Sequence, residues 1–236
     1  MLKVESVSVF YDIVQVLHDV SFEVRKGEFV ALLGGNGSGK TTLLDTISGL
    51  NRPASGSIAF DDGQRIDKLP PHDIVKVGIQ QVPEGRKVFP YLTVIENLYM
   101  GASGRQEAWK KRRETLQRVF KMFPILKARG KLYPGMLSGG EQQMLVIARG
   151  IMSLPKMLMI DEPSLGLAPK TISEIYEIIG SLHEEGITIL LAEQNIEQAL
   201  ELASRGYVLE NGRVVMEGTN ETILGSSHVK QAYLGL

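Results

Sequence analysis

Short runs of consecutive apolar residues recur along the chain, and they predict buried strands. Residues 29–33, 157–160 and 188–192 form such runs, and each is followed by a glycine or a charged residue. A helical pattern at residues 41–48 follows the first run, and Gly49 is placed to end that helix. Because strand-like stretches alternate with helix-like ones here, the sequence predicts a parallel α/β core.

Other stretches alternate between apolar and polar residues and predict antiparallel strands. Residues 4–10, 20–24 and 56–60 have this pattern, and residues 207–216 predict a β-hairpin around an Asn-Gly turn. From about residue 97 to residue 137 the spacing of apolar residues is instead helical. We therefore expect an antiparallel β subdomain and a helical lobe beside the parallel core.

A candidate phosphate-binding loop lies between the first buried strand and its helix. Residues 34–41 fit the pattern G-x-x-x-x-G-K-[ST]. Glycines let successive backbone N–H groups turn towards an anion, and the helix N-terminus adds unpaired N–H groups. Lys40 is placed to reach the β- and γ-phosphates of ATP, and the Thr41 hydroxyl to bind Mg²⁺. The predicted ATP-binding loop comprises Gly34, Gly35, Asn36, Gly37, Ser38, Gly39, Lys40, Thr41 and Thr42.

Two alternatives to a phosphate site are a plain Gly-rich turn and a dinucleotide site. The flanking strand and helix argue against the plain turn, since a phosphate loop requires both. A dinucleotide site is disfavoured because this segment contains no G-x-G-x-x-G pattern.

The buried run at residues 157–160 is followed by two carboxylates and a proline. In a P-loop NTPase this pattern supplies Asp161 to the Mg²⁺ shell. Glu162 is then positioned to orient or deprotonate the attacking water. The alternative is an acidic pair that caps the next helix, but a complete phosphate loop elsewhere in the chain favours the catalytic interpretation.

Between these two segments lies Leu-Ser-Gly-Gly-Glu-Gln at residues 137–142. The order of phosphate loop, this motif and hydrophobic-Asp-Glu-Pro resembles an ABC-type ATPase across essentially the whole chain. A helix expected from about residue 141 to residue 153 would offer a second anion-binding N-terminus. The resemblance implies that this end binds the γ-phosphate held by a partner subunit, and hence that two subunits sandwich ATP. The implied signature residues are Ser138, Gly139, Gly140 and Glu141.

The resemblance also implies how the chain is divided. A single ABC ATPase domain would span residues 1–236. Its α/β P-loop core and antiparallel β subdomain would comprise residues 1–96 and 155–236. Its helical lobe would comprise residues 97–154 and carry the signature motif.

Further family positions can be transferred one at a time. The resemblance places Tyr11 where the family has an aromatic side chain that stacks on adenine; the alternative is an ordinary strand aromatic. Residues 164–167 resemble the loop that crosses the dimer interface after the catalytic glutamate. Ala168 stands where the family usually has aspartate, so part of the usual hydrogen bonding between sites is not expected.

Two positions depart more clearly from the family pattern. The family's glutamine-loop position is occupied by Glu84, whose carboxylate would still bind Mg²⁺ or water, while Gln80 and Gln81 are nearby substitutes. The switch-histidine position is occupied by Gln194, which hydrogen-bonds a γ-phosphate but carries no positive charge. Slower or partner-dependent hydrolysis is therefore expected.

Residues 82–86, 161–169 and 192–195 narrow the resemblance to ATP-binding subunits of branched-chain amino acid importers, of the LivF type. Amide and urea importers have similar subunits and remain an alternative. The resemblance implies ATP and Mg²⁺ as cofactors. It also implies a second ABC ATPase subunit in a homo- or heterodimer, membrane permeases, a solute-binding protein acting through the permease, and a peripheral location on the cytoplasmic face of the membrane.

Composition limits the other classes of function. The chain has 26 Lys+Arg against 27 Asp+Glu, so a strongly basic nucleic-acid binder is not indicated. It has no Cys, which excludes a disulfide framework, and no apolar run approaches the roughly 18–20 residues that span a bilayer. A membrane role is therefore expected only through a partner. The basic run at residues 109–113 favours a solvated helix face over an anionic-lipid or nucleic-acid site.

Two rival functions remain after this comparison. A soluble ABC ATPase of DNA repair or translation usually has a long coiled-coil insertion or tandem cassettes, and the sequence shows neither. A catalytically silent ATP-binding scaffold would explain Glu84 and Gln194, but the intact Glu162 argues against it.

Residues 86–92, with two aromatics, a proline and two cations, are expected to line a groove for a permease helix, with loop packing as the alternative.

Overall fold

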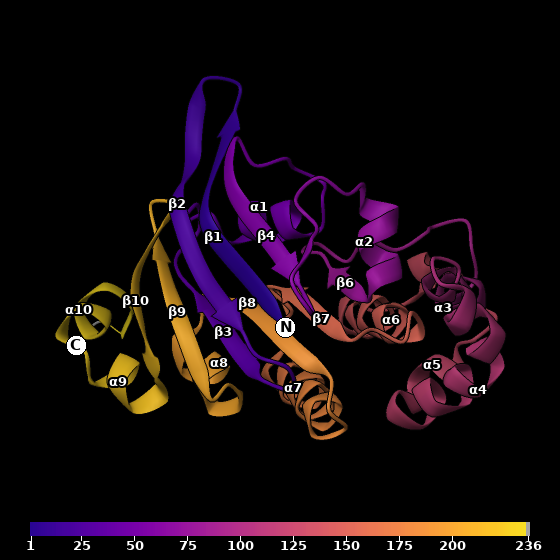
Figure 1. Cartoon of the computed structure of the whole chain (residues 1–236). Helices are drawn as coiled ribbons and strands as arrows, with labels where there is room; N and C mark the ends of the chain where they lie inside the picture. Colours follow the sequence, from indigo (N-terminus) through magenta and orange to yellow (C-terminus); the bar gives the residue numbers. More distant parts are fainter. Residues whose placement is uncertain (235–236) are drawn as a thin grey trace. The chain divides into compact units, whose positions relative to one another are not determined.

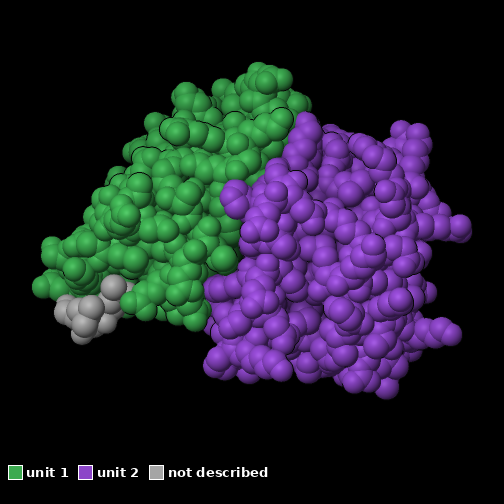
Figure 2. Space-filling view, turned by 90° about the horizontal axis from the view of Figure 1, so that it is seen from below, with its two compact units in different colours: residues 1–71, 188–236 green, residues 72–187 purple. Residues whose placement is uncertain are grey.

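The computed structural model describes residues 1–234 and divides into two compact units. The first unit comprises residues 1–71 and 188–236, and the second comprises residues 72–187 (Figure 2). Within residues 1–234, no helix is both long and apolar enough to cross a bilayer.

An antiparallel sheet in the first unit confirms the expected β subdomain. Its strands are β1 (Leu2–Tyr11), β2 (Val14–Val24), β4 (Ser55–Phe60) and β5 (Gln64–Arg65), in the order β2-β1-β4-β5. The strands β1 and β2 form the long hairpin drawn in indigo in Figure 1. Strand β2 begins earlier than the alternating pattern predicted, because irregular pairing along β1 interrupts the alternation.

The parallel strands of the first unit carry the phosphate loop. Strand β3 (Phe29–Leu33) is buried along its whole length and pairs in parallel with β8 (Thr188–Glu193) and β9 (Arg205–Glu210). Strand β10 (Arg213–Thr219) completes the predicted hairpin with β9. Asn211 and Gly212, with φ of 46° and 73°, make the tight turn that Asn-Gly predicts. The helices of this unit are α1 (Lys40–Ile47), α8 (Ile196–Leu202), α9 (Asn220–Gly225) and α10 (Ser227–Val229), followed by the short π-helix η2 (Lys230–Leu234).

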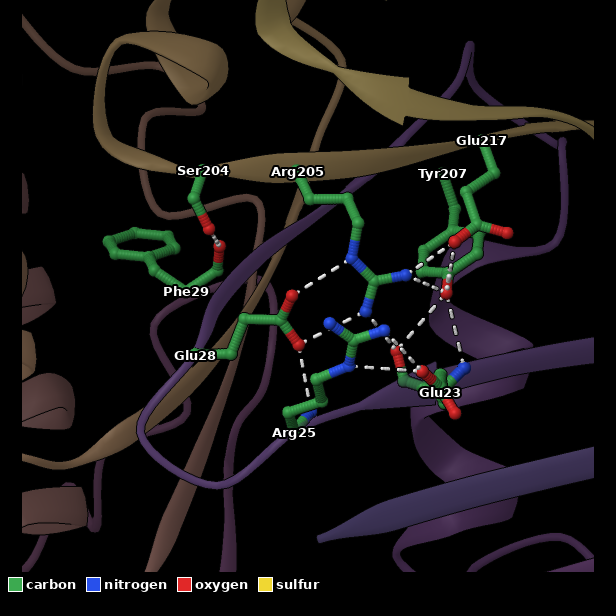
Figure 3. A network of polar contacts seen from close by, with 8 residues as sticks. All are labelled: Glu23, Arg25, Glu28, Phe29, Ser204, Arg205, Tyr207 and Glu217. Carbon is green, nitrogen blue, oxygen red and sulfur yellow. Dashed lines mark hydrogen bonds and ion pairs between the residues drawn. The ribbon is translucent and has the colours of Figure 1, made fainter.

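A polar network centred on Arg205 joins the starts of β3 and β9 (Figure 3). Its Nε and Nη2 donate to the two carboxylate oxygens of Glu28 at 2.9 and 3.0 Å, and Nη2 also reaches the Glu23 carbonyl. Burial alone would raise the pKa of Glu28, but hydrogen bonds from Arg205 and from the Arg25 N–H lower it. Burial raises the pKa of the Tyr207 phenol in the same network. The network thus links the start of β9 to the start of β3, and β3 is the strand that leads into the phosphate loop.

The second unit contains its own parallel strand pair. Strand β6 (Ile79–Val82) pairs in parallel with β7 (Met157–Asp161), which is fully buried. The helix α2 (Pro71–Val77) precedes β6, and α7 (Pro169–Glu184) follows β7. The helix α6 (Gly139–Met152) begins two residues earlier than expected, because Ser138 is its N-cap.

The helical segment of the second unit confirms the expected lobe, but it is interrupted. It consists of α3 (Val94–Ala102), α4 (Gln106–Met122), α5 (Pro124–Ala128) and the turn η1 (Pro134–Met136) (Figure 1). Thr93 starts α3 with a capping box to Glu96, and Pro124 starts α5 after the break at Phe123. The predicted segment 97–154 lies wholly within this unit.

Candidate functional site

The phosphate loop lies where the sequence predicts it, between β3 and α1. A Cβ on Gly34 would lie 2.3 Å from the Leu209 carbonyl oxygen, so the close approach of the backbones requires glycine. Gly39, the N-cap of α1, has φ of 107°, which side chains rarely adopt. These two glycines shape the loop and expose the N-terminus of α1 to an anion.

Lys40 is folded back over this loop. Its side chain is almost fully buried, and Nζ donates to the carbonyl oxygens of Gly34 at 2.7 Å and Gly35 at 3.1 Å. An ammonium group has three donors, so it can share them between carbonyl and phosphate oxygens. The Ser38 Oγ is buried in the same loop with no hydrogen-bond partner within the described residues. The loop therefore holds a positive charge and a polar hydroxyl ready for phosphate.

Tyr11 lies next to the first turn of α1, at the end of β1. Its hydroxyl accepts a hydrogen bond from Asn51 Nδ2 at 2.7 Å and lies 3.5 Å from Thr42 Oγ1. The side chain is nevertheless 46% exposed. The hydrogen bond holds the Tyr11 ring in place while about half of its surface stays exposed, so the ring can stack on a planar base. An aromatic side chain that only packs in the core would be buried. Asn51 was not identified from the sequence.

Gln194 follows β8 at the same sheet edge as the phosphate loop. Leu33 pairs with Glu193 in parallel register, and the Gly34 N–H donates to the Glu193 carbonyl at 3.3 Å. The next residue on β8 is therefore beside the next residue on β3, and Gln194 is exposed there. The structure thus brings Gln194, Tyr11 and the phosphate loop together in the first unit.

Tyr233 is a neighbour of the phosphate loop that sequence reasoning missed. Its ring lies 4.0 Å from the position a Cβ on Gly35 would take, and its hydroxyl donates to Glu210 Oε1 at 3.0 Å. His228 Nε2 lies 2.8 Å from the same carboxylate oxygen. Burial, reinforced by the hydrogen bond to Glu210, raises the pKa of Tyr233 to about 12. No motif links this distant residue to the loop, so only the fold reveals it.

The two candidate carboxylates of the second unit lie at the end of β7. Asp161 is its last residue and is fully buried, while Glu162 is 8% exposed with φ of 46°. Val82 of β6 pairs with Ile160, so the segment after β6 runs beside these carboxylates and brings Glu84 to the same edge. Gln80 and Gln81 remain within the strand β6, before that edge.

The signature residues form a capped helix N-terminus. Ser138 Oγ accepts from the Glu141 N–H at 3.3 Å, and Glu141 Oε2 accepts from the Ser138 N–H at 2.7 Å. This capping box orients the first turn of α6. A Cβ on Gly140 would lie 2.7 Å from Thr171 Cγ2, so α6 and α7 approach each other closely there. The motif therefore forms the capped N-terminus of α6, and its first two helical residues are glycines.

The loop after Glu162 is contacted by Arg86, which sequence reasoning placed only in the segment 86–92. Arg86 donates to carbonyls of this loop from across the second unit. Ala168 is the N-cap of α7, and its side chain makes no capping hydrogen bond. The expected loss of hydrogen bonding between the sites of two subunits at Ala168 stays a prediction.

Mg²⁺ is the metal that a nucleotide site of this kind implies. The Thr41 hydroxyl is exposed on the first turn of α1, and the Asp161 carboxylate ends β7. Both are hard oxygen donors of the type that Mg²⁺ prefers, usually together with waters and phosphate oxygens. No group of three or more His, Cys, Asp and Glu side chains in residues 1–234 forms a metal cage of its own. Each of the two, taken by itself, has the chemistry of a ligand for Mg²⁺.

Comparisons with known proteins agree with this geometry. Residues 17–165 match the family model described as ABC transporter. The chain is 51% identical over 235 residues to the "High-affinity branched-chain amino acid transport ATP-binding protein BraG" of Pseudomonas aeruginosa, covering 100% of both chains. It is 38% identical to the "Probable branched-chain amino acid transport ATP-binding protein LivF" of Archaeoglobus fulgidus, covering 100% of this chain and 99% of that protein.

A solved structure has the same fold. It is a dimeric ATP-binding cassette in a post-hydrolysis state with ADP and Pi bound, 28% identical, with a TM-score of 0.84 over 93% of this chain and 99% of that one. The family match covers more than half of the chain, and the strands, phosphate loop and capped signature helix agree with it. The chain therefore belongs to the ABC transporter family.

Proposed function

We propose that the chain is the ATP-hydrolysing subunit of an importer for branched-chain amino acids. The observation that carries the ATPase function is the phosphate loop, in which Lys40 Nζ lies within hydrogen-bonding distance of two loop carbonyls. The choice of solute rests on the full-length similarity to an amino acid transport protein. An amide or urea importer is the alternative.

ATP binding is assigned to the first unit. The loop N–H groups and Lys40 bind the β- and γ-phosphates, while the exposed ring of Tyr11 stacks on adenine. Thr41 and Asp161, with Glu84 as a further donor, would hold Mg²⁺, which neutralises charge that develops on the transferred phosphoryl group.

Hydrolysis is assigned to Glu162, which accepts a proton from the attacking water or orients it. A partner cassette supplies Ser138, Gly139, Gly140 and Glu141 of its own chain to the same nucleotide, so ATP closes a dimer. The dimeric cassette with the same fold supports this assembly. Closing and reopening then drive permease subunits, on whose cytoplasmic side the chain is bound, and a solute-binding protein acts through the permease.

Gln194 offers a first test of the site. Gln194→His should raise kcat for ATP hydrolysis about threefold, because a histidine that carries positive charge makes a stronger hydrogen bond to a phosphate oxygen. Steady-state ATPase kinetics measure this change, with Gln194→Asn as a control that keeps the amide. A lower kcat in Gln194→His would mean that the site is tuned around glutamine.

The segment at residues 86–92 offers a test of permease binding. Tyr91 is 91% exposed, whereas the half-exposed Phe89 lies under the Arg149 guanidinium at 4.8 Å and its backbone is bound by the Asn97 side chain. An exposed aromatic beside a fixed one is suited to anchor a partner helix.

Tyr91→Ala should therefore weaken permease association on the order of tenfold without changing the unfolding temperature. Phe89→Ala should weaken association and also lower the unfolding temperature, because Phe89 has intramolecular contacts. Affinity for the detergent-solubilised permease and thermal unfolding of the isolated subunit measure the two effects. Unchanged affinity in both variants would place the contact elsewhere.

The proposed transport function is tested by comparing ATPase rates with and without the permease subunits. We expect the permease complex to hydrolyse ATP faster, and a transported amino acid with its binding protein to stimulate it further. A rate that is indifferent to the permease would instead indicate a soluble ATPase, and no hydrolysis in either state would indicate a silent scaffold.

A further inference from the structure

Arg86 reaches from the segment after β6 to the loop that follows Glu162. Its Nη2 donates to the carbonyl oxygens of Leu165 at 3.3 Å and Gly166 at 3.0 Å. These partners lie 79 and 80 residues away in the sequence. The backbone of Arg86 has φ of 52°, a conformation that costs energy for a non-glycine residue and that the surrounding contacts must hold.

The same guanidinium packs against the start of the signature helix. A Cβ on Gly139 would lie 2.4 Å from Arg86 Nη1 and 3.0 Å from Cζ, so the guanidinium packs directly on this glycine and would have to shift to admit a side chain. Gly139 is the first residue of α6. A cation at a helix N-terminus is electrostatically unfavourable, so helix packing alone does not explain its place. The two carbonyls offset this repulsion, since each offers a charge-assisted hydrogen bond.

The loop that Arg86 contacts is continuous with Glu162. The Leu165 N–H donates to the Glu162 carbonyl at 3.3 Å, and the Leu167 N–H donates to the Ser164 carbonyl at 3.2 Å. Glu162 begins this turn with φ of 46°. The position of its carboxylate therefore depends on a turn in which Arg86 holds the carbonyl oxygens of Leu165 and Gly166.

We infer that Arg86 is a positioning residue for ATP hydrolysis. It fixes the turn that presents Glu162 and holds that turn against the first residue of the signature helix. Glu162, which acts on a subunit's own nucleotide, and Gly139, which faces the partner's nucleotide, then move as one body. This inference rests on the proposed roles of Glu162 and the signature motif.

The test is a comparison of ATPase kinetics and hydrogen exchange in Arg86 variants. Arg86→Gln should lower kcat about tenfold, because the turn loses both bonds and Glu162 is less often in position, whereas the KM for ATP should stay within about twofold. The amides of residues 164–168 should exchange faster. Arg86→Lys, which keeps the charge but lacks the planar fork, should restore part of kcat.

Arg105→Gln is the matched control. Arg105 likewise donates to two successive carbonyls in the same unit, those of Ser153 and Leu154, but away from the Glu162 turn. It should leave kcat and the amide exchange of residues 164–168 unchanged.

Wild-type kcat in Arg86→Gln, or an equal loss in Arg105→Gln, would overturn the inference. If Arg86→Gln does not fold, wild-type kcat in Arg86→Lys together with unchanged exchange would overturn it instead. Failure of the transport function has a different signature, which is wild-type ATP hydrolysis without solute uptake. Failure of the Glu162 role would appear as full activity in Glu162→Gln.

Discussion

Glu162→Gln should lower kcat for ATP hydrolysis by about 10²–10⁴ while ATP binding is retained. Glutamine has nearly the same shape as glutamate but accepts no proton at neutral pH. Glu162 is almost buried at the end of β7, so an amide of equal size should be accommodated without unfolding. Because ATP binds but is not consumed, the variant should accumulate as an ATP-bound dimer. Single-turnover hydrolysis and size-exclusion chromatography with ATP measure the two effects.

Glu84→Gln tests the other carboxylate proposed for the site, and its glutamine keeps an oxygen that can bind Mg²⁺ or water. Glu84 lies at the same edge of the β6–β7 strand pair, but it is exposed and follows β6. Its replacement should leave ATP affinity intact. Hydrolysis at nearly the wild-type rate in Glu162→Gln would remove Glu162 from catalysis, and collapse of ATP affinity in Glu84→Gln would show that Glu84 is needed for Mg²⁺ or for the loop.

Lys40→Ala should weaken ATP binding by at least about tenfold, which corresponds to about 1.4 kcal/mol, or abolish turnover. The change removes the positive charge that lies over the loop and also its two hydrogen bonds to the Gly34 and Gly35 carbonyls. Equilibrium binding of ATP and the unfolding temperature should be measured together. A loss of affinity in a variant that still folds assigns the effect to phosphate binding.

Lys26→Ala is a suitable control for the loss of one positive charge. Lys26 is exposed in the turn before β3, in the same unit as the phosphate loop. It should bind ATP as the wild type does. Unchanged affinity and rate in Lys40→Ala would exclude Lys40 from the site.

Local patterns made the phosphate loop and its strands predictable. The bounds of β3 agree with the apolar run at residues 29–33, and Asn-Gly gives the β9–β10 turn. The breaks in the helical segment had local signals too, since Gly104 and Pro124 lie at them. The early start of β2 had none, because irregular pairing along β1 removes the alternation that identifies a strand.

Contacts between distant residues account for what the sequence did not reveal. Arg86 meets its carbonyl partners about 80 residues later, and Tyr233 meets Gly35 from near the other end of the chain. Every residue has a backbone carbonyl, so the sequence does not show which carbonyls accept hydrogen bonds. No sequence motif therefore identifies the contacts of Arg86. Asn51 and Tyr11, 40 residues apart, are another such pair.

The most direct measurement is ATP-dependent uptake of radiolabelled leucine into proteoliposomes that contain the chain with its permease and binding protein. The account predicts saturable leucine uptake that requires ATP and is lost in the Glu162→Gln variant. Uptake of urea or a short-chain amide but not of leucine would contradict the proposed substrate. ATP hydrolysis without uptake of any of these solutes would contradict the transport function itself.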